Sequence, residues 1–169
     1  MDNSSVITMP SVEKLTTSPT TNVFDVATWF LQKQPMTHKK LQKLCYYAQA
    51  WHLALLNRPL FGEEIQAWIH GPVIPKLYAK YADYGWEEIS VKNENINPSF
   101  PQNTIEVLNA VWNTYHNLDG EQLEALTHSE KPWQEARNGI APLEPSENVI
   151  SYQSMRDFYN KLYQESQND

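Results

Sequence analysis

Residues 60–81, LFGEEIQAWIHGPVIPKLYAKY, are the stretch around which the rest of the chain is organised. Apolar residues alternate with polar or amphipathic ones from Ile65 to His70, and this period of two predicts a short strand with one buried face. Gly71-Pro72 then stops the strand, because glycine admits unusual backbone angles and proline offers no N–H group. Pro75 suits the first turn of a helix, where that N–H has no partner in any case. The stretch therefore predicts a strand, a corner and a helix.

The segment just before it, residues 36–56, predicts the central helix of the fold. Thr37 is a favourable N-cap, and apolar residues then recur every three or four positions. The later turns are apolar nearly all round, which is typical of a helix contacted on several sides. The main apolar stripe consists of Leu41, Leu44, Cys45, Ala48, Trp51, His52 and Leu55.

Helical periodicity continues through most of the remaining chain. Further helices are predicted after a cap at Asn22, over Ile105–Tyr115, after a capping box at Asp119–Gln122, and after a cap at Ser151 or Ser154. The loop of residues 87–101 is expected to hold at most a short strand. The predicted fold class is mainly α (α+β): a compact helical domain around a central apolar helix, with a small short-stranded sheet.

The two ends of the chain differ in composition. Residues 1–21 are rich in Ser and Thr and show no sustained period, so a flexible N-terminal arm is predicted there. Residues 22–169 then form one folded domain, as the length favours.

The charge and the cysteine content indicate which partners and which cellular compartment to expect. Thirteen basic and twenty acidic residues give a net charge of −7, which disfavours nucleic acid as a partner. A single cysteine, Cys45, excludes an internal disulfide, and neither a secretory signal nor a membrane-length apolar run is recognisable. A cytoplasmic protein without a membrane partner is expected. Six Trp and nine Tyr fit a protein-binding module, although a small aromatic-rich core would have the same composition.

Motifs for catalysis and metal binding are missing from the sequence. The glycines are isolated, no serine lies in a nucleophile elbow, and the histidines do not follow zinc-ligand spacing. We therefore expect no enzyme activity, no cofactor and no metal. His70, beside the Gly-Pro corner, is either a contact residue or a local hydrogen-bonding group. A hydrolase would need His70, His128 and a carboxylate gathered in one cleft.

A DNA-binding regulator is the main alternative. The first two helices and the turn between them have helix-turn-helix proportions. Lys33, Lys39, Lys40 and Lys43 cluster there. The apolar character of the second helix and the acidic chain oppose this alternative.

Several blocks of the sequence resemble one known family. They are DVATWFL at 25–31, MTHKKLQKLCYYAQAWHLALL at 36–56, PLFGEEIQAWIHGPVI at 59–74, Leu126-Thr-His128, and Pro132-Trp133 followed by Ala136-Arg137. Together they resemble the Panacea domain, the SocA-like antitoxin family, whose members are also labelled phage-associated or GepA-like proteins.

The resemblance implies a bacterial or phage antitoxin that binds and neutralises a cognate toxin encoded nearby. Presentation of the toxin to a cellular protease is a second mechanism in the same class, and no catalytic residue is implied. The outward face of the strand and the tendency of aromatic residues to anchor interfaces suggest toxin contacts at Trp68, His70, Tyr78, Tyr81, Lys39 and Lys43. The motif residues expected to have structural roles are Leu41, Gln42, Lys43, Leu44, Tyr47, Trp51, Gly71, Pro72, Pro75 and Trp133.

Overall fold

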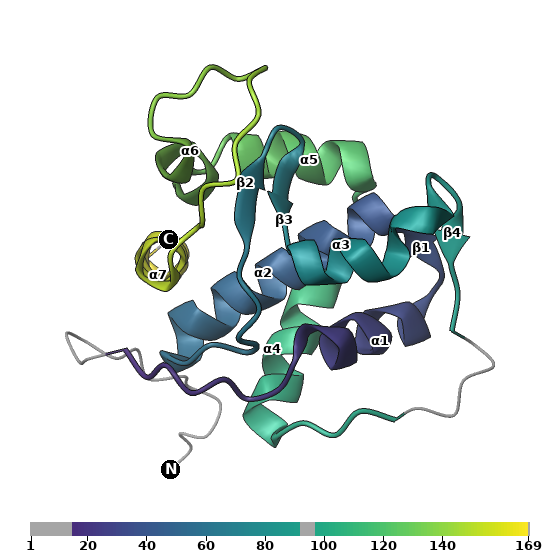
Figure 1. Ribbon diagram of the computed structural model, residues 1–169. Coiled ribbons are helices and arrows are strands. Elements are labelled where there is room, and N and C mark those ends of the chain that lie inside the picture. The colour runs from purple at the N-terminus through teal and green to yellow at the C-terminus, as the bar shows by residue number, and fades with distance from the viewer. Residues whose placement is uncertain (1–14, 92–96, 169) are drawn as a thin grey trace, which may run out of the picture.

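Helix α2 (His38–Leu56) runs through the centre of the computed structural model, which describes residues 15–91 and 97–168 (Figure 1). The helix begins as predicted, because the Thr37 side chain accepts a hydrogen bond from the Lys40 N–H at 3.3 Å. It ends at Asn57, which adopts the left-handed conformation with φ 56°. Every residue of α2 is buried except for Lys39, Lys40, Trp51 and Leu56, which are half-buried. The predicted central position of this helix is confirmed.

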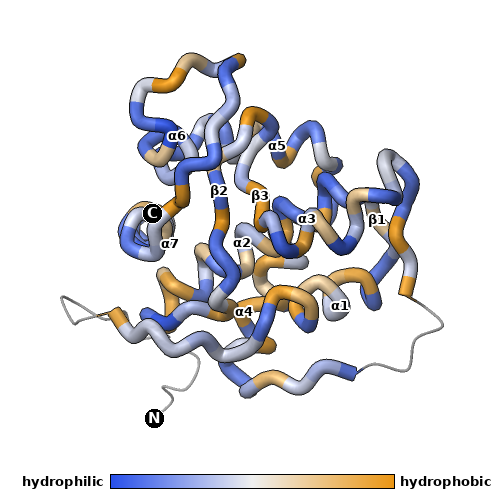
Figure 2. Tube along the Cα trace, in the orientation of Figure 1, coloured by the Kyte–Doolittle hydropathy of each residue, from blue (hydrophilic) through white to orange (hydrophobic). Residues whose placement is uncertain are grey.

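Three long helices pack around α2. They are α1 (Val23–Lys33), α4 (Gln102–Tyr115) and α7 (Tyr152–Gln167). The predicted caps are present: Asn22 accepts from the Asp25 N–H, and Ser151 accepts from the Ser154 N–H. Figure 2 shows hydrophobic residues gathered where α1, α2 and α4 meet. In the described part of the chain, no helix is long and apolar enough to cross a membrane.

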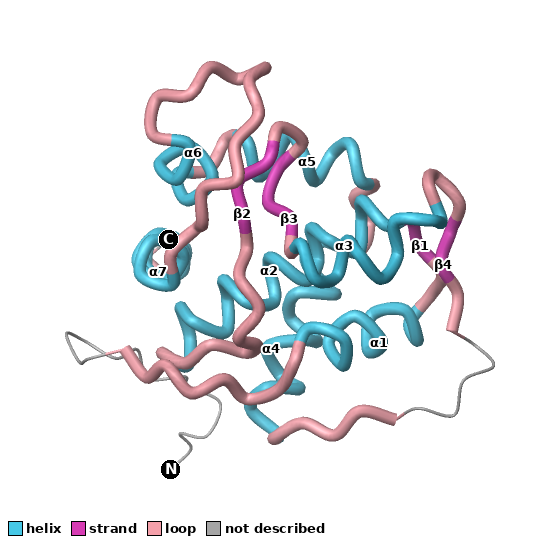
Figure 3. The backbone as a smooth tube through the Cα atoms, viewed as in Figure 1, coloured by secondary structure: helices cyan, strands magenta, loops and turns pink. Residues whose placement is uncertain are grey.

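A short β-hairpin lies beside the N-terminal half of α2 (Figure 3). It consists of β2 (Gln66–Trp68) and β3 (Gly71–Val73), paired antiparallel with Trp68 opposite Gly71. The predicted strand is therefore present and ends before Gly71, but the corner lies at residues 69 and 70 and not at Gly71-Pro72. Gly71, at φ 107°, and Pro72 instead begin the return strand.

Short elements complete the fold. Helix α3 (Pro75–Tyr81) has Pro75 in its first turn, as predicted, and leads into the 3-10 turn η1 (Ala82–Tyr84). Helix α5 (Gly120–His128) opens with the predicted capping box, and α6 (Lys131–Arg137) follows it. The sequence did not reveal a second strand pair, β1 (Met36–Thr37) with β4 (Glu88–Ile89). Two residues are too few to show a period. The fold class is mainly α with small antiparallel strand pairs, as predicted.

The chain before α1 is hydrogen-bonded to the fold. Thr16, Thr20 and Thr21 donate their N–H groups to the carbonyls of residues 57, 59 and 60, at 3.3, 3.1 and 2.8 Å respectively. Residues 15–21 are therefore hydrogen-bonded to the fold at three positions, although residues 16–19 are exposed. The flexible arm over residues 1–21 stays a prediction. Residues 1–14 of that predicted arm lie outside the described residues.

A buried polar network ties α2 to α6 and α7. The Glu130 carboxylate is 8 % exposed and accepts hydrogen bonds from Tyr47 at 2.7 Å and from Tyr159 at 2.8 Å. Burial raises the pKa of Glu130, while the two hydroxyl donors act in the opposite direction. The carboxylate and the two hydroxyls satisfy one another's buried hydrogen-bonding atoms. These bonds fix the position of α7 against α2.

Candidate functional site

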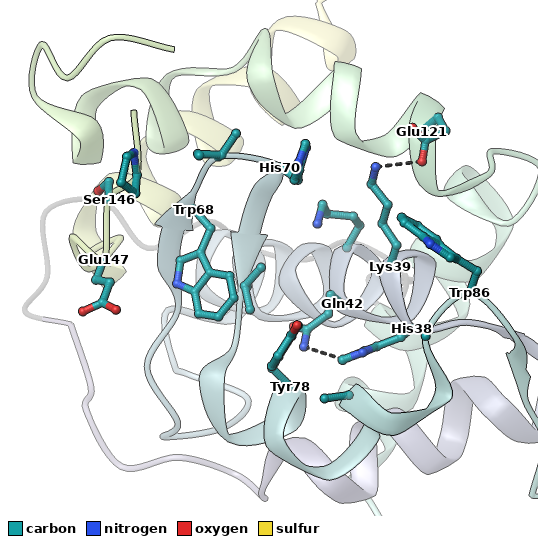
Figure 4. Close-up of a pocket in the computed structure, with 16 residues that line it drawn as sticks. His38, Lys39, Gln42, Trp68, His70, Tyr78, Trp86, Glu121, Ser146 and Glu147 are labelled. Atoms are coloured by element: carbon teal, nitrogen blue, oxygen red, sulfur yellow. Dashed lines mark hydrogen bonds and ion pairs between the residues drawn. The ribbon is translucent and has the colours of Figure 1, made fainter. Parts of the chain in front are cut away.

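A groove of about 780 Å³ opens beside the N-terminal turns of α2 (Figure 4). The β2–β3 hairpin, the segment from α3 to Trp86, and α5 form its sides, and residues 145–147 close one end. We call it the aromatic groove; the side chains used below are those of His38, Lys39, Gln42, Lys43, Trp68, His70, Tyr78, Trp86, Glu121 and Glu147.

The aromatic residues of the groove are partly exposed and partly in contact with one another. The ring of Tyr78 lies 5.1 Å from that of His38 and 5.2 Å from that of Trp68. Tyr78 is 43 % exposed, and Trp86, at the other end of the groove, is 78 % exposed. Among the described residues, the Trp86 indole makes no hydrogen bond or ring contact. Exposed apolar side chains that share one groove, as Trp86 and Tyr78 do, are typical of a binding surface.

Gln42 joins the floor of the groove to the hairpin. Its Oε1 accepts from the Ile74 N–H at 2.8 Å, and its Nε2 lies 3.0 Å from His38 Nε2. Because the amide nitrogen is a donor, His38 Nε2 accepts, so His38 is neutral in this contact. Burial, the larger cause, and the nearby charge of Lys43 together lower the pKa of His38 to about 4.

A charged cluster forms the side of the groove next to α5. Lys39 pairs with Glu121 at 2.7 Å and also with Glu124, and His70 Nδ1 lies 3.1 Å from the second oxygen of Glu124. Burial opposes charge on Lys39, but the two carboxylates raise its pKa overall. Burial likewise opposes charge on Glu124, yet Lys39 and His70 lower its pKa overall. The cluster is held together as an ionic network.

Lys43 lies beneath the hairpin and not on the surface. It is 2 % exposed, and its Nζ donates to the Pro72 carbonyl at 3.4 Å. A Cβ atom at Gly71 would lie 2.6 Å from Lys43 Cε, so the glycine makes room for the lysine stem. Burial, the main cause, and the charge of Lys39 together lower the pKa of the Lys43 amine to about 7.

Five of the six suggested contact residues line the aromatic groove, namely Lys39, Lys43, Trp68, His70 and Tyr78. Lys43 and Tyr81, however, are only 2 % and 5 % exposed, so the expectation that these two side chains lie on an outer face was wrong. Tyr81 packs towards His38 and Lys43 is covered by the hairpin. Sequence reasoning missed Trp86 and Glu147, whose only local signal is their position in irregular segments.

Several motif residues lie in the core or in side-chain contacts between elements. Leu41, Leu44 and Tyr47 are fully buried in the core, while Trp51 Nε1 donates to the Tyr115 hydroxyl at 2.9 Å. Trp133 donates to the Trp68 carbonyl at 2.8 Å and stacks on His128, with ring centroids 4.0 Å apart. The contacts of Trp133 join β2 of the hairpin to α6 and α5.

The basic face needed for DNA binding does not form. Lys39 is held by two carboxylates, Lys40 donates to the His116 carbonyl at 2.6 Å, and Lys43 is buried. Lys33 lies over the Trp29 ring, 4.5 Å from its centroid. Of these four lysines only Lys33 is exposed, so the cationic surface that the helix-turn-helix alternative requires is reduced to one residue.

The groups named for a hydrolase do meet around Glu124. His70 and His128 lie 3.1 and 3.9 Å from the same carboxylate oxygen. The other oxygen is paired with Lys39, and the nearby Thr127 hydroxyl donates to the Glu124 backbone carbonyl. No nucleophile is hydrogen-bonded to either imidazole among the described residues. In the same part of the chain, no three His, Cys, Asp or Glu side chains are placed so that they could hold a metal ion.

Comparison with known proteins identifies relatives of this chain. The family model described as "Antitoxin SocA-like, Panacea domain" matches residues 41–134. A curated protein named "Antitoxin SocA", from Caulobacter vibrioides (strain NA1000 / CB15N), is 30 % identical over 116 residues. That alignment covers 62 % of this chain and 62 % of the relative's length. No solved structure matches.

Proposed function

Because this chain belongs to the family of SocA-like antitoxins with a Panacea domain, we propose that it is the antitoxin of a bacterial or phage toxin–antitoxin system. In this proposal the protein binds its cognate toxin, encoded nearby, and blocks the toxin by covering it. The single observation that carries the proposal is the family match over residues 41–134, which takes in α2 from Leu41 onward, the hairpin, α3 and α5.

The aromatic groove is the proposed contact surface. Exposed Trp and Tyr side chains dominate the energy of protein–protein interfaces, since they bury a large area and have few rotatable bonds. Trp86 and Tyr78 have those properties, and the Trp68 ring beside Tyr78 extends the surface they offer. The buried network below the groove, with Gln42 bonded to the backbone of Ile74, keeps the groove pre-formed. A pre-formed surface loses little conformational freedom on binding.

Binding alone suffices for neutralisation in this proposal, so the protein needs no catalytic group of its own. A second mechanism in the same class is the presentation of the bound toxin to a cellular protease. Both mechanisms begin with the same protein–protein contact. They differ in the fate of the toxin, which stays intact when it is only covered and disappears when it is degraded.

Co-expression tests the proposal. The neighbouring gene is expressed in cells from an inducible promoter, with and without this protein, and growth is measured. We expect the neighbouring gene alone to arrest growth and the pair to grow, with the two proteins co-purifying. An immunoblot of the toxin then separates covering from degradation. If the neighbouring gene is harmless alone, or stays lethal beside this protein, the antitoxin proposal is refuted.

Variants locate the contact surface. The double substitution Trp86→Ala and Tyr78→Ala removes two exposed aromatic residues and should weaken toxin binding by about thirtyfold or more, the size of one strong interface residue. The matched control is Leu162→Ala on α7, which removes another exposed apolar side chain (38 % exposed) away from the groove. The control should bind like the wild type. Equal binding by all three proteins would place the contact surface elsewhere.

A further inference from the structure

The charge that the aromatic groove presents to solvent is negative. Glu121 and Lys39 form an ion pair, but the Glu121 side chain is 74 % exposed and that of Lys39 only 13 %. The carboxylate therefore faces outward and covers the ammonium group. At the other end, the exposed Glu147 has no ion-pair partner among the described residues. Figure 4 shows Glu121 near Trp86 and Glu147 near Trp68, so a carboxylate accompanies a tryptophan at each end.

The cationic side chains of the groove already have partners within the protein. Lys39 is shared between Glu121 and Glu124, and the Lys43 amine lies under the hairpin with its hydrogen bond to Pro72. His70 is engaged by the other oxygen of Glu124. An anionic ligand would find no free positive charge here and would meet two carboxylates, which makes an acidic partner unfavourable.

Aromatic rings beside carboxylates favour a cationic side chain. The face of a Trp or Tyr ring attracts an ammonium or guanidinium group, and arginine in particular stacks on such rings. The protein uses this chemistry within its own fold: the guanidinium of Arg137 lies over the Trp133 ring, 4.9 Å from its centroid. The rings of Trp68, Tyr78 and Trp86 line the groove with no internal cation recorded over them among the described residues.

We propose that the aromatic groove binds a basic segment of a protein partner, with arginine or lysine side chains packed on Trp68, Tyr78 and Trp86 and paired with Glu147 and Glu121. This inference rests on the proposed function where it takes the partner to be the toxin. The chemistry of the groove itself is independent of that function, and it can be measured without a toxin.

The first experiment uses the full-length chain labelled with ¹⁵N and observes the indole N–H signals of its tryptophans by NMR. The probe is the capped peptide Gly-Arg-Leu-Arg-Gly, and the matched probe is Gly-Glu-Leu-Glu-Gly. We expect the basic peptide to shift the Trp68 and Trp86 signals and to bind at least tenfold more tightly than the acidic one. Equal binding of the two peptides, or shifts confined to the other tryptophans, would overturn the proposal.

Substitution then tests the carboxylate of Glu147. Glu147→Gln should weaken binding of the basic peptide by about threefold, as expected for one exposed charge pair, and Glu147→Lys should weaken it further. The matched control is Glu144→Gln, which makes the same charge change in the same loop at a residue that does not line the groove. If Glu144→Gln and Glu147→Gln weaken binding equally, the effect is one of net charge and the assignment of Glu147 is wrong.

The toxin experiment separates this inference from the proposed function. If the wild-type protein neutralises the neighbouring gene product, the charge reversal Glu147→Lys should reduce its affinity for that product by tenfold or more while the melting temperature stays unchanged. Undiminished neutralisation and affinity would sink the basic-segment inference and leave the antitoxin function standing. If the wild-type protein neutralises nothing, the antitoxin function fails, and the peptide titration still decides the chemistry of the groove.

Discussion

Replacement of Lys43 by methionine should change how stability depends on pH. Lys43 is 2 % exposed, and burial, with a further contribution from Lys39, lowers its pKa from 10.5 to about 7. Glu124 and Glu121 act in the opposite direction without compensating for the burial. Between about pH 7 and pH 10.5, the unfolded chain therefore keeps the lysine proton that the folded protein releases. Because the unfolded state binds more protons in that window, the wild-type protein must become more stable as the pH rises through it.

The size of the effect follows from the two pKa values. One pKa unit corresponds to about 1.4 kcal/mol, and the folded protein is half-deprotonated at its own pKa. From pH 7 to pH 9, Lys43 should thus add about 2 kcal/mol to the free energy of unfolding. Lys43→Met keeps an unbranched side chain beneath the hairpin and has no proton to release, so this contribution disappears.

Urea unfolding, followed by circular dichroism at pH 7, 8 and 9, measures the effect. The difference between the wild-type protein and the variant is compared across pH, so titrations common to both proteins cancel. Lys76→Met is the matched control, since it removes the same charge from an exposed position on α3. The control should follow the wild type. A Lys43→Met protein with the same pH dependence as the wild type would refute the burial argument.

Three further substitutions test other parts of the structure, the first two by urea unfolding and the third by limited proteolysis. Gly71→Ala should lower the free energy of unfolding by about 2–3 kcal/mol, because φ is 107° and the new Cβ would lie 2.6 Å from Lys43 Cε. The control Gly139→Ala, at φ 84° with open space around it, should lower it less. Equal losses of stability in the two variants would contradict the packing argument. Tyr47→Phe should cost about 1–3 kcal/mol, since the buried Glu130 carboxylate loses a donor at 2.7 Å; a neutral result would show that the network is dispensable. Arg137→Met should expose the loop of residues 139–149 to proteolysis, because the guanidinium donates to the carbonyls of residues 67, 141 and 144; unchanged cleavage would exclude this anchoring role.

Helix boundaries were predictable from sequence because their determinants are local. Thr37 caps α2 by bonding to the N–H three residues later, and Asp119 and Gln122 form their capping box within one turn. The hairpin was only half predicted. The strand period of residues 65–70 was visible in the sequence. The return strand beginning at Gly71 depends on pairing across a turn, and a Gly-Pro dipeptide does not predict that pairing. The pair of β1 with β4 joins segments about fifty residues apart and leaves no local pattern.

In the candidate site, too, side-chain positions that depend on local sequence were predicted, whereas those that depend on distant contacts were not. The alternation predicted for residues 65–70 placed Trp68 and His70 on the outward face, and both line the groove. Ile65 and Ala67 are buried as that rule requires, whereas Ile69, in the turn, is only half-buried. Lys43 was misplaced because a lysine on a helix is normally solvated, and only the fold of the hairpin over α2 buries it. Trp86 joins the groove through the path of the chain after η1, which no period in its neighbours predicts.

The contact between α2 and α7 affects the order of events during synthesis. Tyr46 and Tyr159, whose hydroxyls lie 3.0 Å apart, are separated by 113 residues of chain. A ribosome that has just finished α2 must add more than a hundred residues before the helix that covers this side exists. Throughout that interval the growing polypeptide exposes an apolar surface of the kind that promotes aggregation. The protein therefore cannot complete its fold until its last helix, α7, has been translated.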